Sequence, residues 1–188
     1  NIWFEIENKQ KLFQEFNLQK DKFYIGSFQR DTEGNDLSSP KLSKGPDKFL
    51  DVVEYYKKQN EEVEVILTGK RRQYVMRGLE EKGISYRYFE MSNFETINKL
   101  YNCLDLYVVS SRVEGGPQSI LECSVTRTPI ISTDVGIASE ILSPSSIYSY
   151  QEIGKANPDI EHAYKNVQQY LLPKGIKNFD KMFKYNEN

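Results

Sequence analysis

LYVVSSRVEGGPQSILE, residues 106–122, joins a short apolar run to paired glycines and then to a helix-forming segment. We predict a strand over residues 105–109 and a helix over residues 117–126, with Pro117 at the first helical position. A strand that opens into glycines before a helix leaves bare backbone N–H groups beyond the strand end. Such a turn can hold a phosphate or a sugar, because its N–H groups and the helix dipole favour an anion.

Two carboxylates flank this turn, Glu114 in the loop and Glu122 about one and a half helical turns after Pro117. Each can accept hydrogen bonds from neighbouring sugar hydroxyls, while Gly115 and Gly116 let the backbone approach a ligand closely. We interpret the two glutamates as binding a nucleotide sugar. Taken alone, the two residues are explained equally well as a solvated loop residue and a surface helix residue.

Along the whole chain, short apolar runs alternate with amphipathic segments. Strands are predicted at residues 22–28, 63–68, 86–89, 105–109, 129–132 and 146–148. Helices are predicted at residues 2–16 (or a connector there), 46–59, 73–82, 94–102, 117–126, 138–142, 157–172 and 176–185. This alternation predicts an α/β fold, a Rossmann-like, doubly wound, mostly parallel sheet with closing C-terminal helices. Ligands of such sheets bind beyond the carboxyl ends of the strands, where the strand order reverses.

The polar loop at residues 29–45 follows the first main strand and is longer than the usual two to six residues. Arg30 and Lys44 stand near its two ends. Two cations aimed at a diphosphate stabilise the charge that develops when its bond to a sugar breaks. The sequence Lys44-Gly45-Pro46 opens a helix, which adds positive potential beside the lysine. Without that context, both cations are ordinary solvated charges.

Two further strand ends point to the same edge of the sheet. Thr68 and Gly69 follow one strand, and Phe89 and Met91 lie at the end of another, where they can pack against a nucleobase. Phe89 is better explained as a core residue. The cluster Lys70-Arg71-Arg72 is interpreted as a solvated turn, and His162 as a structural residue of a peripheral helix.

Composition excludes several classes of function. The 25 basic and 27 acidic residues leave a formal net charge of -2, so no overall field attracts nucleic acid or anionic lipid. Cys103 and Cys123 lie in apolar patterns typical of buried thiols, and with one histidine we expect no metal site. We find neither a signal peptide nor an apolar run near the ~18 residues of a membrane span. We expect a cytoplasmic protein, with peripheral attachment at the inner face of the membrane left open.

Ordered motifs between residues 23 and 142 resemble the nucleotide-sugar-binding, C-terminal half of the group 1 (family 4) retaining glycosyltransferases, which have the two-domain GT-B fold. That family carries two glutamates separated by seven residues, as Glu114 and Glu122 are. Its glycine-containing strand end with a following basic residue, and its Lys-Gly pair, resemble Gly26-Ser27-Phe28-Gln29-Arg30 and Lys44-Gly45-Pro46. Residues 66–69, 101–111 and 129–140 look like its remaining landmarks.

The resemblance implies a role for each residue. Glu114 would contact the donor hexose, Glu122 the ribose hydroxyls, and Arg30 with Lys44 the diphosphate of a UDP or GDP sugar, without metal or cofactor. Backbone N–H groups of residues 116–119 would hold the sugar and phosphates. The expected catalytic residues are therefore Glu114, Arg30 and Lys44. The expected donor-binding residues are Gly26, Ser27, Thr68, Gly69, Phe89, Met91, Gly115, Gly116, Pro117, Gln118, Ser119 and Glu122.

The domain division expected is a helix or connector at 1–20, a nucleotide-sugar-binding domain at 21–156, and its closing helices at 157–188. The leading hypothesis is the donor-binding domain of an enzyme that transfers a hexose to a glycan or lipid acceptor, as in polysaccharide biosynthesis. A preceding acceptor domain, which this chain lacks, would bind that acceptor. One alternative is a non-catalytic nucleotide-binding or scaffold module. Another, a nucleotide-sugar epimerase, is disfavoured by the single histidine.

Overall fold

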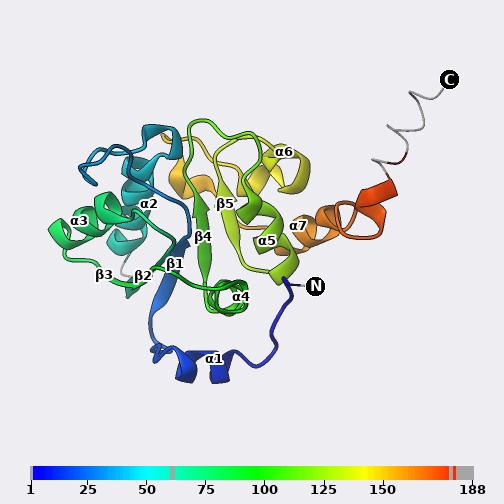
Figure 1. Ribbon diagram of the computed structural model, residues 1–188, viewed down its shortest axis with the longest axis horizontal. Helices are drawn as coiled ribbons and strands as arrows, with labels where there is room; N and C mark the ends of the chain where they lie inside the picture. The colour runs from blue at the N-terminus through cyan, green and yellow to red at the C-terminus, as the bar shows by residue number, and fades with distance from the viewer. Residues whose placement is uncertain (1, 60–61, 178–179, 181–188) are drawn as a thin grey trace.

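The computed structural model describes residues 2–59, 62–177 and 180, and it contains one parallel sheet flanked by helices (Figure 1). The strands are β1 (Phe23–Ser27), β2 (Val63–Thr68), β3 (Ser85–Phe89), β4 (Leu106–Val109) and β5 (Ile130–Ser132). Their order across the sheet is β3-β2-β1-β4-β5, and every pairing is parallel. The predicted Rossmann-like α/β fold is confirmed.

Helices cover both faces of the sheet. The α-helices are α1 (Lys9–Glu15), α2 (Pro46–Lys58), α3 (Gln73–Glu81), α4 (Phe94–Asn102), α5 (Gln118–Thr126), α6 (Ala138–Ile141) and α7 (Ile160–Val167). Short 3-10 helices lie at Leu42–Lys44, Pro144–Ser146 and Ile153–Lys155. One hydrophobic cluster joins the sheet to α2 and α3, and a second joins its other face to α1, α4, α5 and α6. Each helix in the described residues is too short or too polar to cross a lipid bilayer.

Alternate side chains along a strand pack into the two clusters on opposite faces of the sheet. On β4, Tyr107 and Val109 belong to the cluster with α4 and α5, whereas Leu106 and Val108 belong to the cluster with α2 and α3. This alternation follows from the two-residue repeat of a strand, and it explains why the central strands read as continuous apolar runs. The core therefore lies on both sides of one buried sheet.

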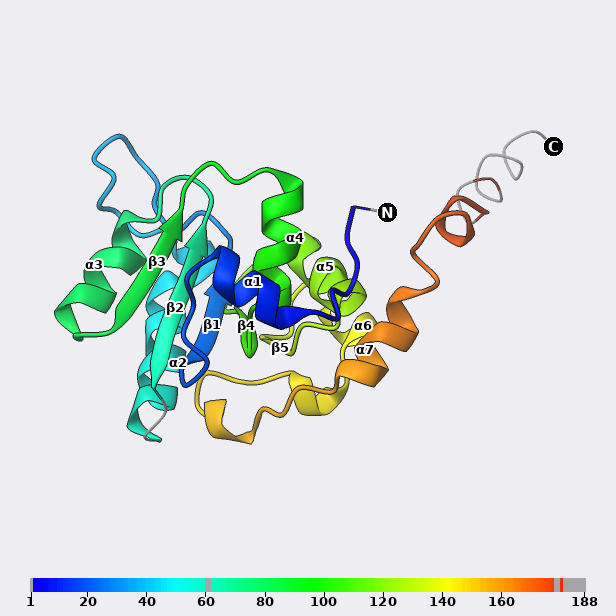
Figure 2. The same ribbon diagram turned by 90° about the horizontal axis from the view of Figure 1, so that it is seen from below.

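The strand order reverses between β1 and β4, which are neighbours in the sheet although residues 28–105 separate them. In Figure 2 the long loop after β1 projects past the arrowheads of β2 and β3, at the carboxyl edge of the sheet. The loop after β4 leaves from the same edge. Parallel α/β sheets bind ligands in the crevice that opens at such a point.

Three predicted elements differ from the structure. The expected strand at 146–148 is replaced by the 3-10 helix Pro144–Ser146 and a single bridge between Ile147 and Ser132. The 3-10 turn forms because the Ser143 side chain caps it and proline suits its first position.

Of the two closing helices expected at 157–172 and 176–185, the first is shorter in the structure. The first is only α7, because the Asp159 side chain accepts from the backbone N–H of His162 and starts the helix there. Most of the second lies outside the described residues. At the other end of the chain, the helix expected over residues 2–16 is confined to α1, and the residues before it run in an extended path beside α4.

Candidate functional site

A cavity of about 470 Å³ opens at the carboxyl edge of the sheet, between the loops that follow β1 and β4. Its volume is within the ~300–1,000 Å³ range of small-molecule sites. Its lining residues are Trp3, Phe28, Gln29, Lys44, Phe94, Ile97, Tyr101, Tyr107, Glu114, Gly116, Pro117, Gln118, Ser119 and Glu122. Seven of these were predicted as site residues: Lys44, Glu114, Gly116, Pro117, Gln118, Ser119 and Glu122.

The N-terminus of α5 forms one wall of the cavity. Pro117 is the N-cap residue of α5 and not its first helical residue, so the free N–H groups begin at Gln118 and Ser119. A Cβ atom added to Gly115 or Gly116 would meet nothing within 4 Å. Because no protein atom requires a glycine at either position, the open space in front of them is available to a ligand.

The cationic part of the site is a contact between Lys44 and Glu114. The Lys44 ammonium group donates to Glu114 Oε1, which also accepts from Ser111 Oγ at 3.0 Å. Gln29, absent from the predicted site, donates from Nε2 to the Lys44 carbonyl at 3.0 Å. The Lys44 and Glu114 side chains are 25% and 12% exposed, so water screens the pair only in part.

Gly45 explains how Lys44 reaches the loop after β4. Its φ of 59° lies in the left-handed region, and a Cβ there would come within 1.8 Å of the Ser110 carbonyl oxygen. Ser110 Oγ donates to the Gly45 carbonyl at 2.8 Å, and the Arg112 N–H donates to the Ser43 carbonyl at 2.8 Å. These contacts fasten the loop after β1 to the loop after β4.

Glu122 of α5 also lines the cavity. Its Oε2 atom accepts a hydrogen bond of 2.7 Å from the hydroxyl of Tyr101, a fully buried residue of α4. Burial raises the pKa of the Glu122 carboxyl above its ordinary value, and the Tyr101 hydrogen bond opposes that shift only in part. The remaining lone pairs of Glu122 are free to accept from hydroxyl groups of a ligand.

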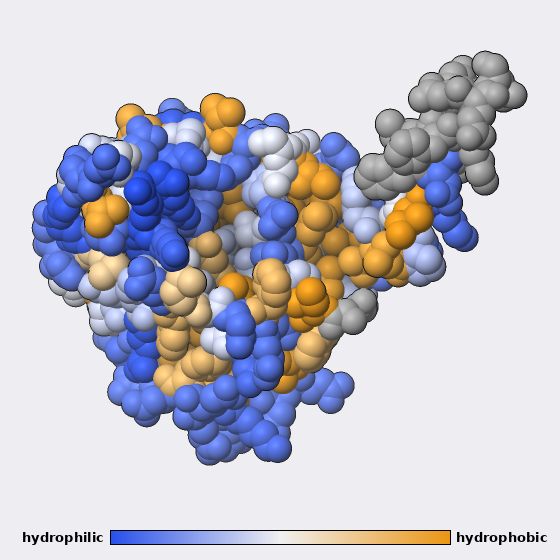
Figure 3. All heavy atoms as spheres, viewed as in Figure 1, coloured by the Kyte–Doolittle hydropathy of each residue, from blue (hydrophilic) through white to orange (hydrophobic). Residues whose placement is uncertain are grey.

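The rest of the lining is largely aromatic. Tyr107 OH accepts from the backbone N–H of Phe28 at 2.9 Å, which fixes the residue after β1 against β4. The Phe28 and Tyr101 ring centroids are 4.8 Å apart. Figure 3 shows hydrophobic residues gathered over α4 and α5, beside a hydrophilic surface over α3 and the long loop. The cavity thus has a polar end at α5 and an apolar end at α4.

Eight predicted site residues do not line this cavity: Gly26, Ser27, Arg30, Thr68, Gly69, Phe89, Met91 and Gly115. Arg30 is exposed, and its Nε atom donates to the Thr32 carbonyl at 2.7 Å. Phe89 packs edge to face on Phe16 with ring centroids 5.6 Å apart. The lining residues that sequence reasoning missed are mostly aromatic, and their sequence signal is that of ordinary core residues.

Arg72 corrects the interpretation of residues 70–72 as a solvated turn. Its side chain is fully buried, and its Nε atom donates to Asp31 Oδ2 at 2.8 Å. Its Nη1 atom donates to the carbonyls of Ser27 and Thr68, at the ends of β1 and β2. Arg72 is buried because carbonyl groups that have left the sheet need donors, and a planar guanidinium supplies several.

No group of three or more His, Cys, Asp or Glu side chains that could hold a metal ion occurs among the described residues. Cys103 and Cys123 are both buried and free, as their apolar surroundings indicated. Neither lines the cavity. The charged side chains that line the cavity are Lys44, Glu114 and Glu122, beside the first residues of α5.

The fold is that of the C-terminal, Rossmann-like domains of GT-B glycosyltransferases. The sequence model of the family described as "Glycosyl transferases group 1" matches residues 8–187. The chain therefore belongs to the group 1 glycosyltransferases.

Solved structures of low sequence identity share this fold. The C-terminal domain of LpcC, a group 1 glycosyltransferase from Francisella tularensis, has a TM-score of 0.62 at 20% identity, over 89% of this chain and 91% of that one. HepE from Anabaena, solved with UDP and glucose, has a TM-score of 0.73 at 16% identity, over 100% of this chain and 54% of that one. Sucrose-phosphate synthase from Thermosynechococcus elongatus has a TM-score of 0.68 at 13% identity, over 98% of this chain and 49% of that one.

This chain spans about half the length of the last two proteins. The comparison with curated proteins gave no match.

Proposed function

We propose that this chain binds the nucleotide diphosphate sugar of a retaining, metal-independent hexosyltransferase. The donor is of the UDP or GDP type, and the acceptor is a glycan or lipid bound by a further domain. HepE, which has the same fold and was solved with UDP and glucose, supports the choice of donor class. We also propose that the enzyme acts at the inner face of the cytoplasmic membrane.

The single observation that carries the proposal is the convergence at one cavity of Lys44, Glu114, Glu122 and the N-terminus of α5. A nucleoside diphosphate sugar needs a cationic or N–H-rich site for its diphosphate and acceptors for its hydroxyls. Lys44 and the N–H groups of Gln118 and Ser119 supply the first, and the two carboxylates supply the second. All of them line the space in front of Gly116, where no protein atom would meet a Cβ.

In the proposed reaction, the bond between the sugar C1 and the diphosphate oxygen breaks, and its electron pair stays on the diphosphate. The acceptor hydroxyl bonds to C1 on the same face and passes its proton to the departing phosphate oxygen. Lys44 and the α5 N-terminus stabilise the charge that grows on the diphosphate, without proton transfer of their own. Glu114 orients the hexose through its hydroxyls.

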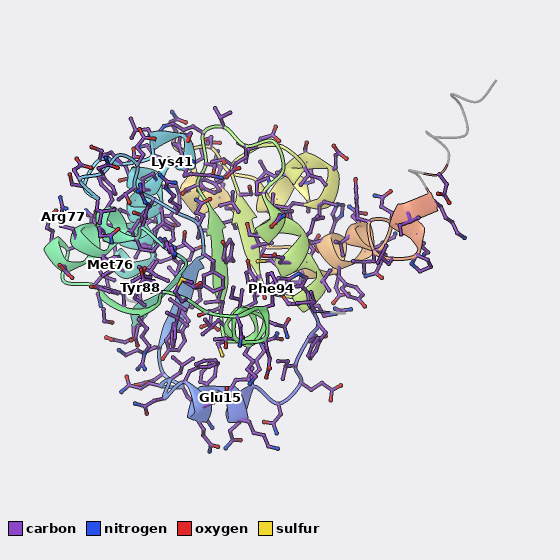
Figure 4. The ribbon with its side chains drawn as sticks, in the orientation of Figure 1. Glu15, Lys41, Met76, Arg77, Tyr88 and Phe94 are labelled. Carbon is purple, nitrogen blue, oxygen red and sulfur yellow. The ribbon has the colours of Figure 1, made fainter. Side chains whose placement is uncertain are left out.

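Calorimetric titration of UDP, GDP and their sugars tests the proposal. Wild type should bind one nucleotide class, and Lys44→Ala and Glu122→Ala should each weaken binding at least tenfold. Lys41→Ala is the matched control, because Lys41 lies in the same loop (Figure 4) but does not line the cavity. Unchanged affinity in both site variants would refute the proposal.

Arg30→Ala belongs in the same series, because the exposed position of Arg30 leaves its expected diphosphate contact open to test. A loss of affinity would mean that Arg30 turns toward the ligand when the donor binds. Little or no hexose transfer is expected from this chain without an acceptor domain. Full turnover by the chain alone would contradict that part of the proposal.

A further inference from the structure

Residues 2–6 form a segment that is tied to α4 by side chains of that helix. The Phe4 N–H donates to Asn98 Oδ1 at 3.0 Å, and the Ile6 N–H donates to Asn102 Oδ1 at 2.8 Å. Asn102 also donates from Nδ2 to the Phe4 carbonyl at 3.1 Å. Both asparagines are only 2% exposed and lie four residues apart, so they present one face of α4 to the segment.

These tethers bring Trp3 to the cavity wall. The Trp3 ring lies edge to face with Phe94, with centroids 5.9 Å apart, and with Tyr101, with centroids 5.7 Å apart. Figures 1 and 2 both place the N-terminal segment beside α4 and α5, and Figure 4 labels Phe94 near α5. Trp3, Phe94, Ile97 and Tyr101 together form the apolar end of the cavity.

Polar and apolar residues follow one another along the cavity in the same order as the parts of a nucleoside diphosphate. Its polar end holds Lys44 and the α5 N-terminus, and its apolar end holds the Trp3 wall. Glu122 connects the two regions, because its carboxylate accepts from Tyr101, whose ring touches Trp3. A nucleoside diphosphate has the same sequence of parts, with a dianion at one end, ribose hydroxyls in the middle and a flat base at the other end.

We propose that Trp3 contacts the nucleobase and contributes to nucleotide affinity at this site. The inference rests on the proposed function, because it names a residue that would read the donor. An aromatic side chain fits this role, since every base offers a flat face for contact and the indole loses little conformational entropy on binding. Removing the Trp3 ring should weaken UDP or GDP binding by roughly tenfold or more.

Trp3 is the single tryptophan of the chain, so its fluorescence reports directly on this wall. The better bound of UDP and GDP should change the emission in a saturable way, with the same dissociation constant as calorimetry. Inorganic pyrophosphate, which has no base, should leave the emission unchanged. The proposal would be overturned if the emission does not change with either nucleotide, or if pyrophosphate changes it equally.

Variants supply the second readout. Their nucleotide affinities are measured by calorimetry, over nucleotide concentrations that span the dissociation constant of wild type. Trp3→Ala should weaken nucleotide binding at least tenfold, and Trp3→Phe should retain most of it. Phe4→Ala is the matched control, because Phe4 is an exposed neighbour outside this cavity, and its affinity should stay within twofold of wild type. Urea unfolding verifies that each variant is folded.

The outcomes separate this inference from the proposed function. If Lys44→Ala loses affinity while folded Trp3→Ala and Trp3→Phe bind as wild type, the role of Trp3 is refuted and the proposed function stands. If wild type binds neither UDP nor GDP, both are refuted. If Trp3→Ala is unfolded, the fluorescence titration of wild type decides.

Discussion

Glu122 is a carboxyl group whose surroundings disfavour its charge. Burial raises the pKa of Glu122, and Tyr101 is the hydrogen-bond donor that opposes this shift. A folded-state pKa above the unfolded value means that the folded protein binds more protons in that pH window. The free energy of unfolding contributed by this group therefore falls as the pH rises from about 4.3, the ordinary glutamate value, through the folded-state pKa.

Glu122→Gln should remove this decline, because glutamine stays neutral and still accepts from Tyr101. We expect the variant to be at least as stable as wild type at pH 7, and the difference to shrink toward pH 4. Urea unfolding of both proteins between pH 4 and 8 measures the effect. Parallel stability profiles would contradict the assignment of the raised pKa to Glu122.

Glu114 neutralises Lys44 in the ligand-free protein, since the two side chains are in contact. A diphosphate must compete with that carboxylate for the ammonium group. Glu114→Gln should therefore raise the affinity for UDP about two- to fivefold, which corresponds to a partly exposed ion pair. Calorimetry checks this, with the exposed Glu33→Gln as control, and a weaker UDP affinity of Glu114→Gln would refute the competition.

At the scale of elements, the long loop after β1 is held at both of its ends. Gly45 packs on Ser110 near the start of α2, and Asp31 pairs with Arg72 near the start of α3. The unusual length of the loop could be recognised in the sequence. The clamp that Arg72 forms with Asp31 could not. A run of three basic residues has the pattern of a solvated turn whether or not one of them is buried.

Arg72→Leu should cost about 3–5 kcal/mol of stability, because it removes the cation that pairs with the buried Asp31 carboxylate and the donor that bonds the Ser27 and Thr68 carbonyls. The variant Lys70→Ala, at an exposed position two residues away, should stay within about 0.5 kcal/mol of wild type. Denaturant unfolding of the two variants measures both values. Equal stabilities would show that the clamp contributes nothing.

Alanine substitutions at two glycines of this edge, Gly45 and Gly116, should have opposite effects on stability and on binding. Gly45→Ala should destabilise the fold by at least about 2 kcal/mol, because the new Cβ meets the Ser110 carbonyl oxygen and the backbone is left-handed. Gly116→Ala should change stability by less than about 1 kcal/mol yet weaken nucleotide binding, since its Cβ would enter only the open cavity. Thermal unfolding and calorimetry on both variants test this, and unaltered binding by Gly116→Ala would mean that the ligand stays away from the turn.

On the scale of the whole molecule, both thiols belong to one hydrophobic cluster, the one that joins the sheet to α1, α4, α5 and α6. Cys103 and Cys123 are 2% and 0% exposed, and burial raises the pKa of Cys103 to about 12. Such thiols react only when the surrounding core opens.

We expect no labelling of the native protein by a disulfide reagent at pH 8, and labelling of both thiols after unfolding in urea. The labelling rate should follow the global unfolding equilibrium as denaturant is added. Rapid labelling of either thiol in native buffer would contradict the packing of α4 and α5 on the sheet.

The sequence by itself determined the parallel α/β fold, because apolar runs bounded by glycines and amphipathic helices are local patterns. It also placed Glu114, Glu122 and the α5 turn at a strand end, since their spacing is local too. Only the tertiary structure decided that Lys44 meets Glu114, that Arg72 is buried and that Trp3 reaches the cavity. These contacts depend on β1 lying beside β4 and on which side chains meet across the core, and no local pattern carries that information.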